Sequence, residues 1–208
     1  MLRLDAFAAL RFAVLVGCCA LSCAGARDAS AQQAATTEAP GTAAAKRTVA
    51  PVAWSDEKVA AETKRVQTDI VKLINCFNTG DVETMFSLLP PKAIEAMGGL
   101  ETGKATVKKV MAKFKEEGIE FQETVAGTPK FLAGPNYEYV VLATKSKLNH
   151  KPKGTSADSY TMQIGMRKRG ETNWRYLDGS RMRRMKQDFI PEFPLDYELP
   201  EPEDVLAK

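Results

Sequence analysis

The stretch from Tyr137 to Asp178 limits the fold of this chain more than any other part of the sequence. Its pattern predicts two long strands and a short third, at Tyr137–Asn149, Asp158–Arg169 and Asn173–Asp178. The connection between the second and third strands is short enough for a tight hairpin. Two alternating sets of residues occupy the middle strand: Tyr160, Met162, Ile164 and Met166 on one face, and Ser159, Thr161, Gln163 and Arg167 on the other. Because a period of two is typical of a half-buried strand, we expect a curved antiparallel sheet covered by helices from the first half of the chain.

Helical patterns fill the region that precedes these strands. A long amphipathic helix is expected from Ser55, a good N-cap, to Gly80, where glycine permits a left-handed closing residue. We expect Ile70, Ile74 and Phe77 of this helix to lie against the concave face of the sheet. The remaining expected elements are a short helix capped by Asp81, a short turn at Pro91–Met97, a helix at Thr102–Glu117, and strands at Ile119–Val125 and Lys130–Ala133. This order predicts an α+β fold with helices packed on one face of a curved antiparallel sheet.

The first long strand is apolar on both of its faces. Tyr139, Val141 and Ala143 alternate with Val140 and Leu142, whereas a sheet with one covered face would show polar residues on the other. A second subunit or the chain's own C-terminal segment must therefore cover the second face. We expect residues 181–208, an acidic extension rich in proline and aromatic residues, to pack on the domain.

Charge is divided unevenly between the strands and this extension. From Lys145 to Lys186 there are 12 Lys and Arg residues against three acids, a net charge of +9, and from Asp188 to Lys208 the net charge is −6. Either the strands form a basic patch for an anionic partner, or the acidic extension lies over them and neutralises them. The net charge of the whole chain, +3, is too small to indicate a nucleic-acid partner.

Residues 1–31 resemble an export signal, with basic residues before a short apolar run. Two processing routes fit them. Leu15-Val16-Gly17-Cys18 resembles a bacterial lipobox, which predicts lipidation of Cys18. Ala24–Ala26 and Ala29–Ala31 instead fit ordinary signal cleavage. Residues 32–53 read as a disordered tether, so we expect an exported protein of the cell envelope, either periplasmic or held to the membrane by a lipid anchor only.

Sites for catalysis or metals are not indicated. Cys76 is the one cysteine outside the N-terminal apolar run, and no pair of cysteines has zinc-ligand spacing. The single histidine, His150, lies in a turn. Because no glycine-rich phosphate loop, nucleophile elbow or metal-ligand cluster is present, we expect no cofactor, no metal and no catalytic set.

Residues 54–180 resemble the NTF2-like (SnoaL-like) superfamily. The motifs are Phe77-Asn-Thr-Gly-Asp81 leading into Met85-Phe-Ser-Leu-Leu-Pro90, and the final strand Asn173-Trp-Arg-Tyr-Leu-Asp-Gly179. The resemblance implies a cone with a pocket between sheet and helices, which members use as isomerases, dehydratases, hydrolases or cyclases, or as binding and assembly modules that are often dimers.

Four residues are candidates to line such a pocket: Tyr139, Gln163, Tyr176 and Asp178. Fold alone does not decide between the activities. We therefore expect a binding or assembly module, and the alternative is a small-molecule isomerase, dehydratase or hydrolase that uses the cone. The expected partner is a small hydrophobic ligand, another protein, or a second copy of the chain.

Overall fold

The computed structural model describes residues 48–179, 187–202 and 206. Its helices are α3 (Asp56–Thr79), α4 (Val82–Ser87), α5 (Pro91–Ala96) and α6 (Leu100–Glu116), and its strands are β1 (Ala50–Pro51), β2 (Ile119–Ala126), β3 (Lys130–Ala133), β4 (Tyr137–His150), β5 (Thr155–Lys168) and β6 (Arg175–Asp178). Short 3-10 turns are η1 (Lys151–Lys153) and η3 (Gln187–Phe189). All the strand pairs are antiparallel. The predicted α+β class is confirmed.

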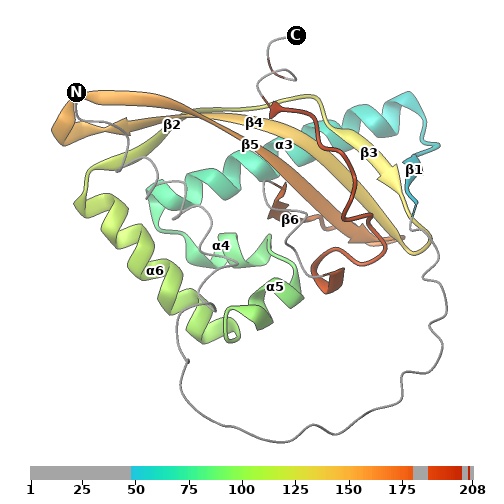
Figure 1. The fold of residues 1–208 in the computed structure, drawn as a ribbon, viewed down its shortest axis with the longest axis horizontal. Coiled ribbons are helices and arrows are strands. Elements are labelled where there is room, and N and C mark those ends of the chain that lie inside the picture. The colour runs from blue at the N-terminus through green and yellow to red at the C-terminus, as the bar shows by residue number, and fades with distance from the viewer. Residues whose placement is uncertain (1–47, 180–186, 203–205, 207–208) are drawn as a thin grey trace, which may run out of the picture.

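The hairpin of β4 and β5 is the centre of the sheet. Its two strands pair without interruption from Tyr137 opposite Lys168 to His150 opposite Thr155. The strand order is β1-β3-β4-β5-β6, and β2 pairs with β4 beyond β3, so the sheet is open rather than closed into a barrel. Figure 1 shows this hairpin running the length of the molecule, with α3 crossing it and α4, α5 and α6 gathered on one side.

Local signals set both ends of α3 and the start of α4 as predicted, whereas α6 begins at Leu100, two residues before the predicted Thr102. The Ser55 side chain accepts a hydrogen bond from the Lys58 amide (3.3 Å), and Gly80 closes α3 with φ 73°. The Asp81 carboxylate accepts from the Thr84 amide at 3.0 Å and so caps α4. These contacts satisfy backbone groups that a helix end leaves unpaired.

One face of the sheet packs against α3. Val66 and Ile70 lie wholly buried against Val140, Leu142 and Tyr176. Ile74 also reaches this cluster.

Phe77 does not lie against the concave face of the sheet, where we expected it. It is half-buried and packs against the rings of Phe114 and Phe121, with centroids 6.0 and 5.5 Å away. At 24 residues, α3 is about 36 Å long, so its last turn passes the central strands and meets α6 and β2 instead.

The opposite face of the sheet packs against the C-terminal segment. Phe189, Ile190 and Phe193 are buried in one cluster with the second face of β4 and β5, and Figure 1 shows this red segment crossing the hairpin. The ring centroids of Phe193 and Tyr139 are 5.0 Å apart, and the Tyr139 hydroxyl donates to the Pro191 carbonyl. Among the described residues no ion pair joins the acids of this segment to the strands. Apolar packing holds the segment, together with the Tyr139–Pro191 hydrogen bond and two hydrogen bonds that the Glu192 carboxylate accepts from Asn136.

The expected tether of residues 32–53 is too long at its C-terminal end. Ala50 and Pro51 pair with Ala133 and Leu132 as strand β1, and Val49 and Val52 pack against the two opposite core clusters. These alternating valines add apolar contacts that a tether would lack. Residues 1–47, including the Cys18 lipobox, and residues 180–186, 203–205, 207 and 208 of the C-terminal extension lie outside the described residues.

In the described part of the chain, none of the helices has the length and apolar character needed to cross a membrane.

Candidate functional site

Three of the four predicted pocket residues share the face of the sheet that packs against α3. Gln163 lies opposite Asp178 across β5 and β6, and Tyr176 lies opposite Gly165. Tyr139 does not join them. It pairs with Met166, and its buried side chain belongs to the cluster covered by the C-terminal segment. Because side chains alternate along β4, this register puts Tyr139 on the face away from the other three.

Tyr176 is the most enclosed polar residue on the α3 side. It has no solvent exposure, and its hydroxyl donates to the Asp69 carboxylate at 3.1 Å. Burial, together with the negative charge of Asp69, raises the pKa of Tyr176 far above its usual value. Gly165 makes room for the ring, since a Cβ there would lie 2.9 Å from a ring carbon of Tyr176. Tyr176 therefore stays protonated and acts as a donor.

Gln163 belongs to a row of polar side chains on the same face, of which Gln163, Thr144 and Ser146 are buried and Thr161 and Thr124 are half-buried. Its amide donates to the Thr161 hydroxyl at 3.2 Å, and that hydroxyl lies 2.6 Å from the hydroxyl of Thr144. Further along, the hydroxyls of Thr124 and Ser146 are 3.1 Å apart. These groups are satisfied by one another, as buried polar groups must be.

Sequence patterns did not single out Arg167, the most elaborately held polar residue. Its side chain is 4% exposed and forms ion pairs of 2.8 Å with both Glu62 and Glu138. The guanidinium also contacts two indoles, lying 4.3 Å from the Trp174 ring centroid and 5.3 Å from that of Trp54. Alternation along the strand placed Arg167 on the polar face, but nothing near it in sequence marks Glu62 as a partner.

Glu62 is fixed by this cluster as well. The Trp174 indole donates to its second carboxylate oxygen at 2.8 Å. Burial alone would raise the pKa of Glu62, but the hydrogen bonds from Trp174 and Arg167 and the charge of Arg167 outweigh it, so the pKa lies below its usual value. Glu62 is therefore an ion-paired carboxylate at neutral pH.

Within the described residues, every buried side-chain nitrogen and oxygen has a hydrogen-bond partner. The same residues contain no cluster of three or more His, Cys, Asp or Glu side chains that would hold a metal ion. The polar groups on the α3 side of the sheet are thus paired internally.

Cys76 and His150 have local roles. Cys76 is buried and unpaired, and burial and the nearby charge of Asp81 raise its pKa to about 11, so it is a poor nucleophile at neutral pH. The His150 ring accepts a hydrogen bond from the Lys153 amide at 3.2 Å, which caps η1. Both agree with the predicted roles of buried apolar residue and turn residue.

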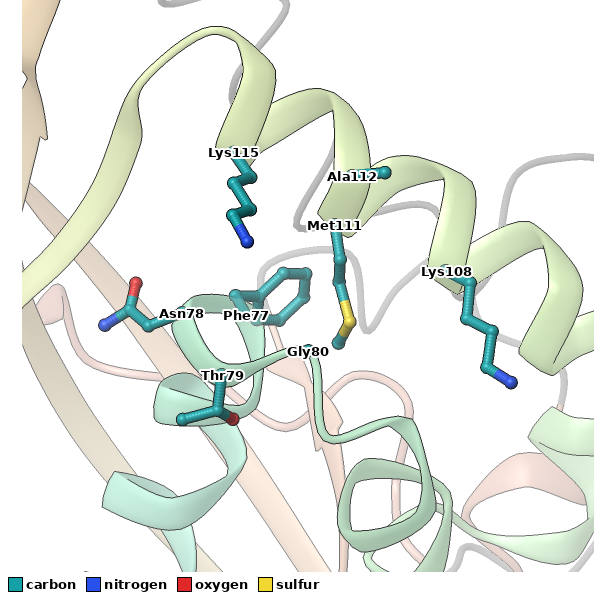
Figure 2. A pocket seen from close by; sticks show the side chains of 8 residues that line it. All are labelled: Phe77, Asn78, Thr79, Gly80, Lys108, Met111, Ala112 and Lys115. Atoms are coloured by element: carbon teal, nitrogen blue, oxygen red, sulfur yellow. The ribbon is translucent and has the colours of Figure 1, made fainter.

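A cavity of about 230 Å³ lies between the end of α3 and α6. Figure 2 shows Phe77 and Met111 between the two helices, with Lys115 pointing over Phe77 and Asn78, and Lys108 at the other end. Thr79, Gly80 and Ala112 complete the lining. We call this cavity the α3–α6 groove. Sequence reasoning missed it because its two walls are about 30 residues apart in the chain.

Neither a model of a known protein family nor a curated protein sequence matches this chain.

Proposed function

We propose that the chain is an exported, envelope-anchored binding or assembly module whose domain is NTF2-like, and that it binds an apolar group bearing a negative charge in the α3–α6 groove. The groove is the observation that carries the binding part of this proposal, whereas export and anchoring rest on the sequence of residues 1–31. The groove combines an apolar floor with two lysines, whereas the polar groups of Gln163, Tyr176 and Arg167 are engaged in internal hydrogen bonds.

The chemistry of the groove selects the ligand class. Phe77 and Met111 offer an aromatic ring and a flexible thioether that adapt to an aliphatic or aromatic group. Lys108 and Lys115 are both exposed, and an ammonium is a compact charge suited to a carboxylate or phosphate. The volume of about 230 Å³ is below that of most small-molecule pockets, about 300–1,000 Å³. The ligand is therefore a small amphiphile or the charged end of a larger one.

Titration with octanoate, followed by NMR shifts of Phe77 and Met111, tests this binding. Lys108→Ala and Lys115→Ala should each weaken binding about 1.5- to 5-fold, because an exposed ion pair contributes about 0.2–1 kcal/mol. Lys109→Ala and Lys113→Ala are matched controls on the same helix but outside the groove, and they should leave the affinity unchanged. Shifts absent from Phe77 and Met111, or equal losses in all four variants, would contradict the proposal.

Anchoring to the envelope has a separate test. Mass spectrometry of the mature protein should find an acylated N-terminal cysteine at Cys18, and Cys18→Ala should release the protein from membranes. A mature N-terminus at Arg27 or Gln32 would refute the lipid anchor and leave export intact.

A second candidate, a small-molecule isomerase, dehydratase or hydrolase, is favoured by the contact between Tyr176 and Asp69. A carboxylate 3.1 Å from a tyrosine hydroxyl resembles a general acid–base pair. A substrate would have to reach a tyrosine with no solvent exposure. If the pair is only structural, Tyr176→Phe will lower stability and leave octanoate binding intact. Loss of a measured turnover without loss of stability would favour the enzyme.

A further inference from the structure

The α3–α6 groove has a lysine at each of its two ends. Lys108 and Lys115 both belong to α6, and at a rise of about 1.5 Å per residue their Cα atoms are about 10 Å apart along the helix axis. This spacing is also almost two full helical turns, so both side chains lie on the same side of α6. Figure 2 shows Lys115 over Phe77 and Lys108 at the other end of the groove.

These two lysines keep their charge available to a ligand. Both are exposed, and among the described residues neither takes part in an ion pair. Lys104 of the same helix, by contrast, forms an ion pair of 2.6 Å with Glu83. The residues that line the groove include no Asp or Glu. The groove therefore presents two positive charges that the protein does not neutralise locally.

The other polar side chains of the groove are bonded within the protein. The Asn78 amide donates to the Phe121 carbonyl at 2.7 Å and accepts from the Phe121 amide at 2.9 Å. The Thr79 hydroxyl donates to the Asn75 carbonyl at 3.2 Å. The remaining side chains of the lining are apolar: Phe77, Met111 and Ala112. A ligand thus meets a cation at each end of the groove and an apolar surface between them.

The path between the two lysines is open because the residue between them is small. Ala112 lies one turn after Lys108 and one turn before Lys115, on the same side of α6. Its side chain is a single methyl group, and it lines the groove. A long side chain at this position would stand between the two ammonium groups.

We propose that the groove binds a linear aliphatic dianion, a chain with a carboxylate at each end. The inference rests on the proposed function, in which the groove binds an apolar group with one negative charge, and it adds a second charge at the far end. An extended chain advances about 1.2 Å per bond, one third of the span of a residue with its three backbone bonds. About eight bonds between the two carboxyl carbons therefore cover about 10 Å, which is the length of nonanedioate.

Matched ligands test the second charge. Nonanedioate and its monomethyl ester have the same chain length, but the ester carries a single charge. Nonanedioate should bind the full chain about 1.5- to 5-fold more tightly than the ester, because it forms one further exposed ion pair. NMR titration measures both dissociation constants, and shifts of the Lys108 and Lys115 side chains locate the two ends of the ligand.

A shorter diacid tests the distance between the two charges. The carboxyl carbons of pentanedioate are about 5 Å apart, so one molecule should not contact both lysines. Pentanedioate should therefore bind about as tightly as its own monomethyl ester.

Variants of α6 test which residues bind the two ends. In Lys108→Ala and in Lys115→Ala, nonanedioate should bind about as tightly as its ester, because one ammonium group remains. Lys109→Ala is the matched control, since Lys109 is exposed on the same helix and does not line the groove. This variant should keep the preference of the natural chain for nonanedioate.

The outcomes separate this inference from the proposed function. If octanoate shifts Phe77 and Met111 but nonanedioate binds no more tightly than its ester, the two-ended site is overturned and binding of a single charge stands. An equal preference for pentanedioate over its ester, or a preference for nonanedioate that persists in both Lys108→Ala and Lys115→Ala, would also overturn the two-ended site. If neither octanoate nor nonanedioate shifts Phe77 and Met111, both proposals are overturned.

Discussion

Arg167 brings a permanent positive charge into the interior of the protein. Two carboxylates and two indole rings surround its guanidinium, and the planar fork allows separate nitrogens to bond Glu62 and Glu138 at once. The favourable interactions offset a large desolvation cost, so the cluster specifies an arrangement of α3 against the sheet more than it adds net stability.

Removing Arg167 should therefore be costly. We expect Arg167→Ala to lower the free energy of unfolding by about 3–5 kcal/mol, because it leaves two largely buried carboxylates without their partner. Lys168→Ala, at the exposed neighbouring position, should change it by less than about 0.5 kcal/mol. Urea unfolding of the two variants measures the difference, and similar values for both would show that the cluster is dispensable.

The depressed pKa of Glu62 predicts how this stability varies with pH. A carboxyl whose pKa is lower in the folded state stabilises the protein above its unfolded pKa of about 4.3. That contribution is lost as the pH falls through the folded pKa. Glu62→Gln should thus lower the free energy of unfolding at pH 7. The difference in free energy of unfolding between this variant and the natural chain should shrink as the pH falls below about 4. A difference that stays constant from neutral to acid pH would contradict the assignment.

At the scale of elements, α3 both covers the sheet and closes its edge. Its apolar stripe packs on β4 and β6, while Gln67 and Asn78 bond the backbone of β2 and the residue after it. One helix thus supplies core contacts and replaces the strand that β2 lacks.

Asn78→Ala isolates the second of these roles. Losing two hydrogen bonds to Phe121 should cost about 1–3 kcal/mol, and the Phe121 amide should exchange with solvent faster. Lys72→Ala, at an exposed position of α3, is the control and should leave that exchange rate unchanged. If the Phe121 amide remains protected in Asn78→Ala, another group closes the edge.

At the scale of the whole molecule, the sheet lies between two different covers. Helix α3 packs on one face, and the short C-terminal segment with Phe189, Ile190 and Phe193 packs on the other. The C-terminal segment is short, so each of its large side chains buries a large part of the apolar surface on that face of the sheet.

Phe193→Ala should lower the free energy of unfolding by about 3–5 kcal/mol, because the ring is fully buried. Asp196→Ala, in the same segment but exposed, should have little effect. Deletion of residues 188–208 should lower the melting temperature further and expose Tyr139, Val141 and Ile164 to self-association. An unchanged melt after deletion would contradict the covering role.

The sequence by itself determined the elements and the need for two covers. Ser55, Gly80 and Asp81 act on backbone groups within four residues of themselves, so their effect can be predicted without knowing the fold. The apolar residues on both faces of β4 likewise required that both faces be covered by other parts of the protein, because removing apolar surface from water stabilises the folded state.

Only the tertiary structure decided which side chains meet. Tyr139 separates from Gln163 and Tyr176 because the register between strands, not the pattern within one, decides which residues share a face. Phe77 leaves the centre of the sheet because the offset of α3 along the strands is set by packing at both of its ends. Arg167 meets Glu62 across 105 residues of chain, and the α3–α6 groove forms between walls that no local pattern relates. Long-range contacts of this kind depend on the packing of the whole chain, whereas caps and periodicity depend on a single turn or strand.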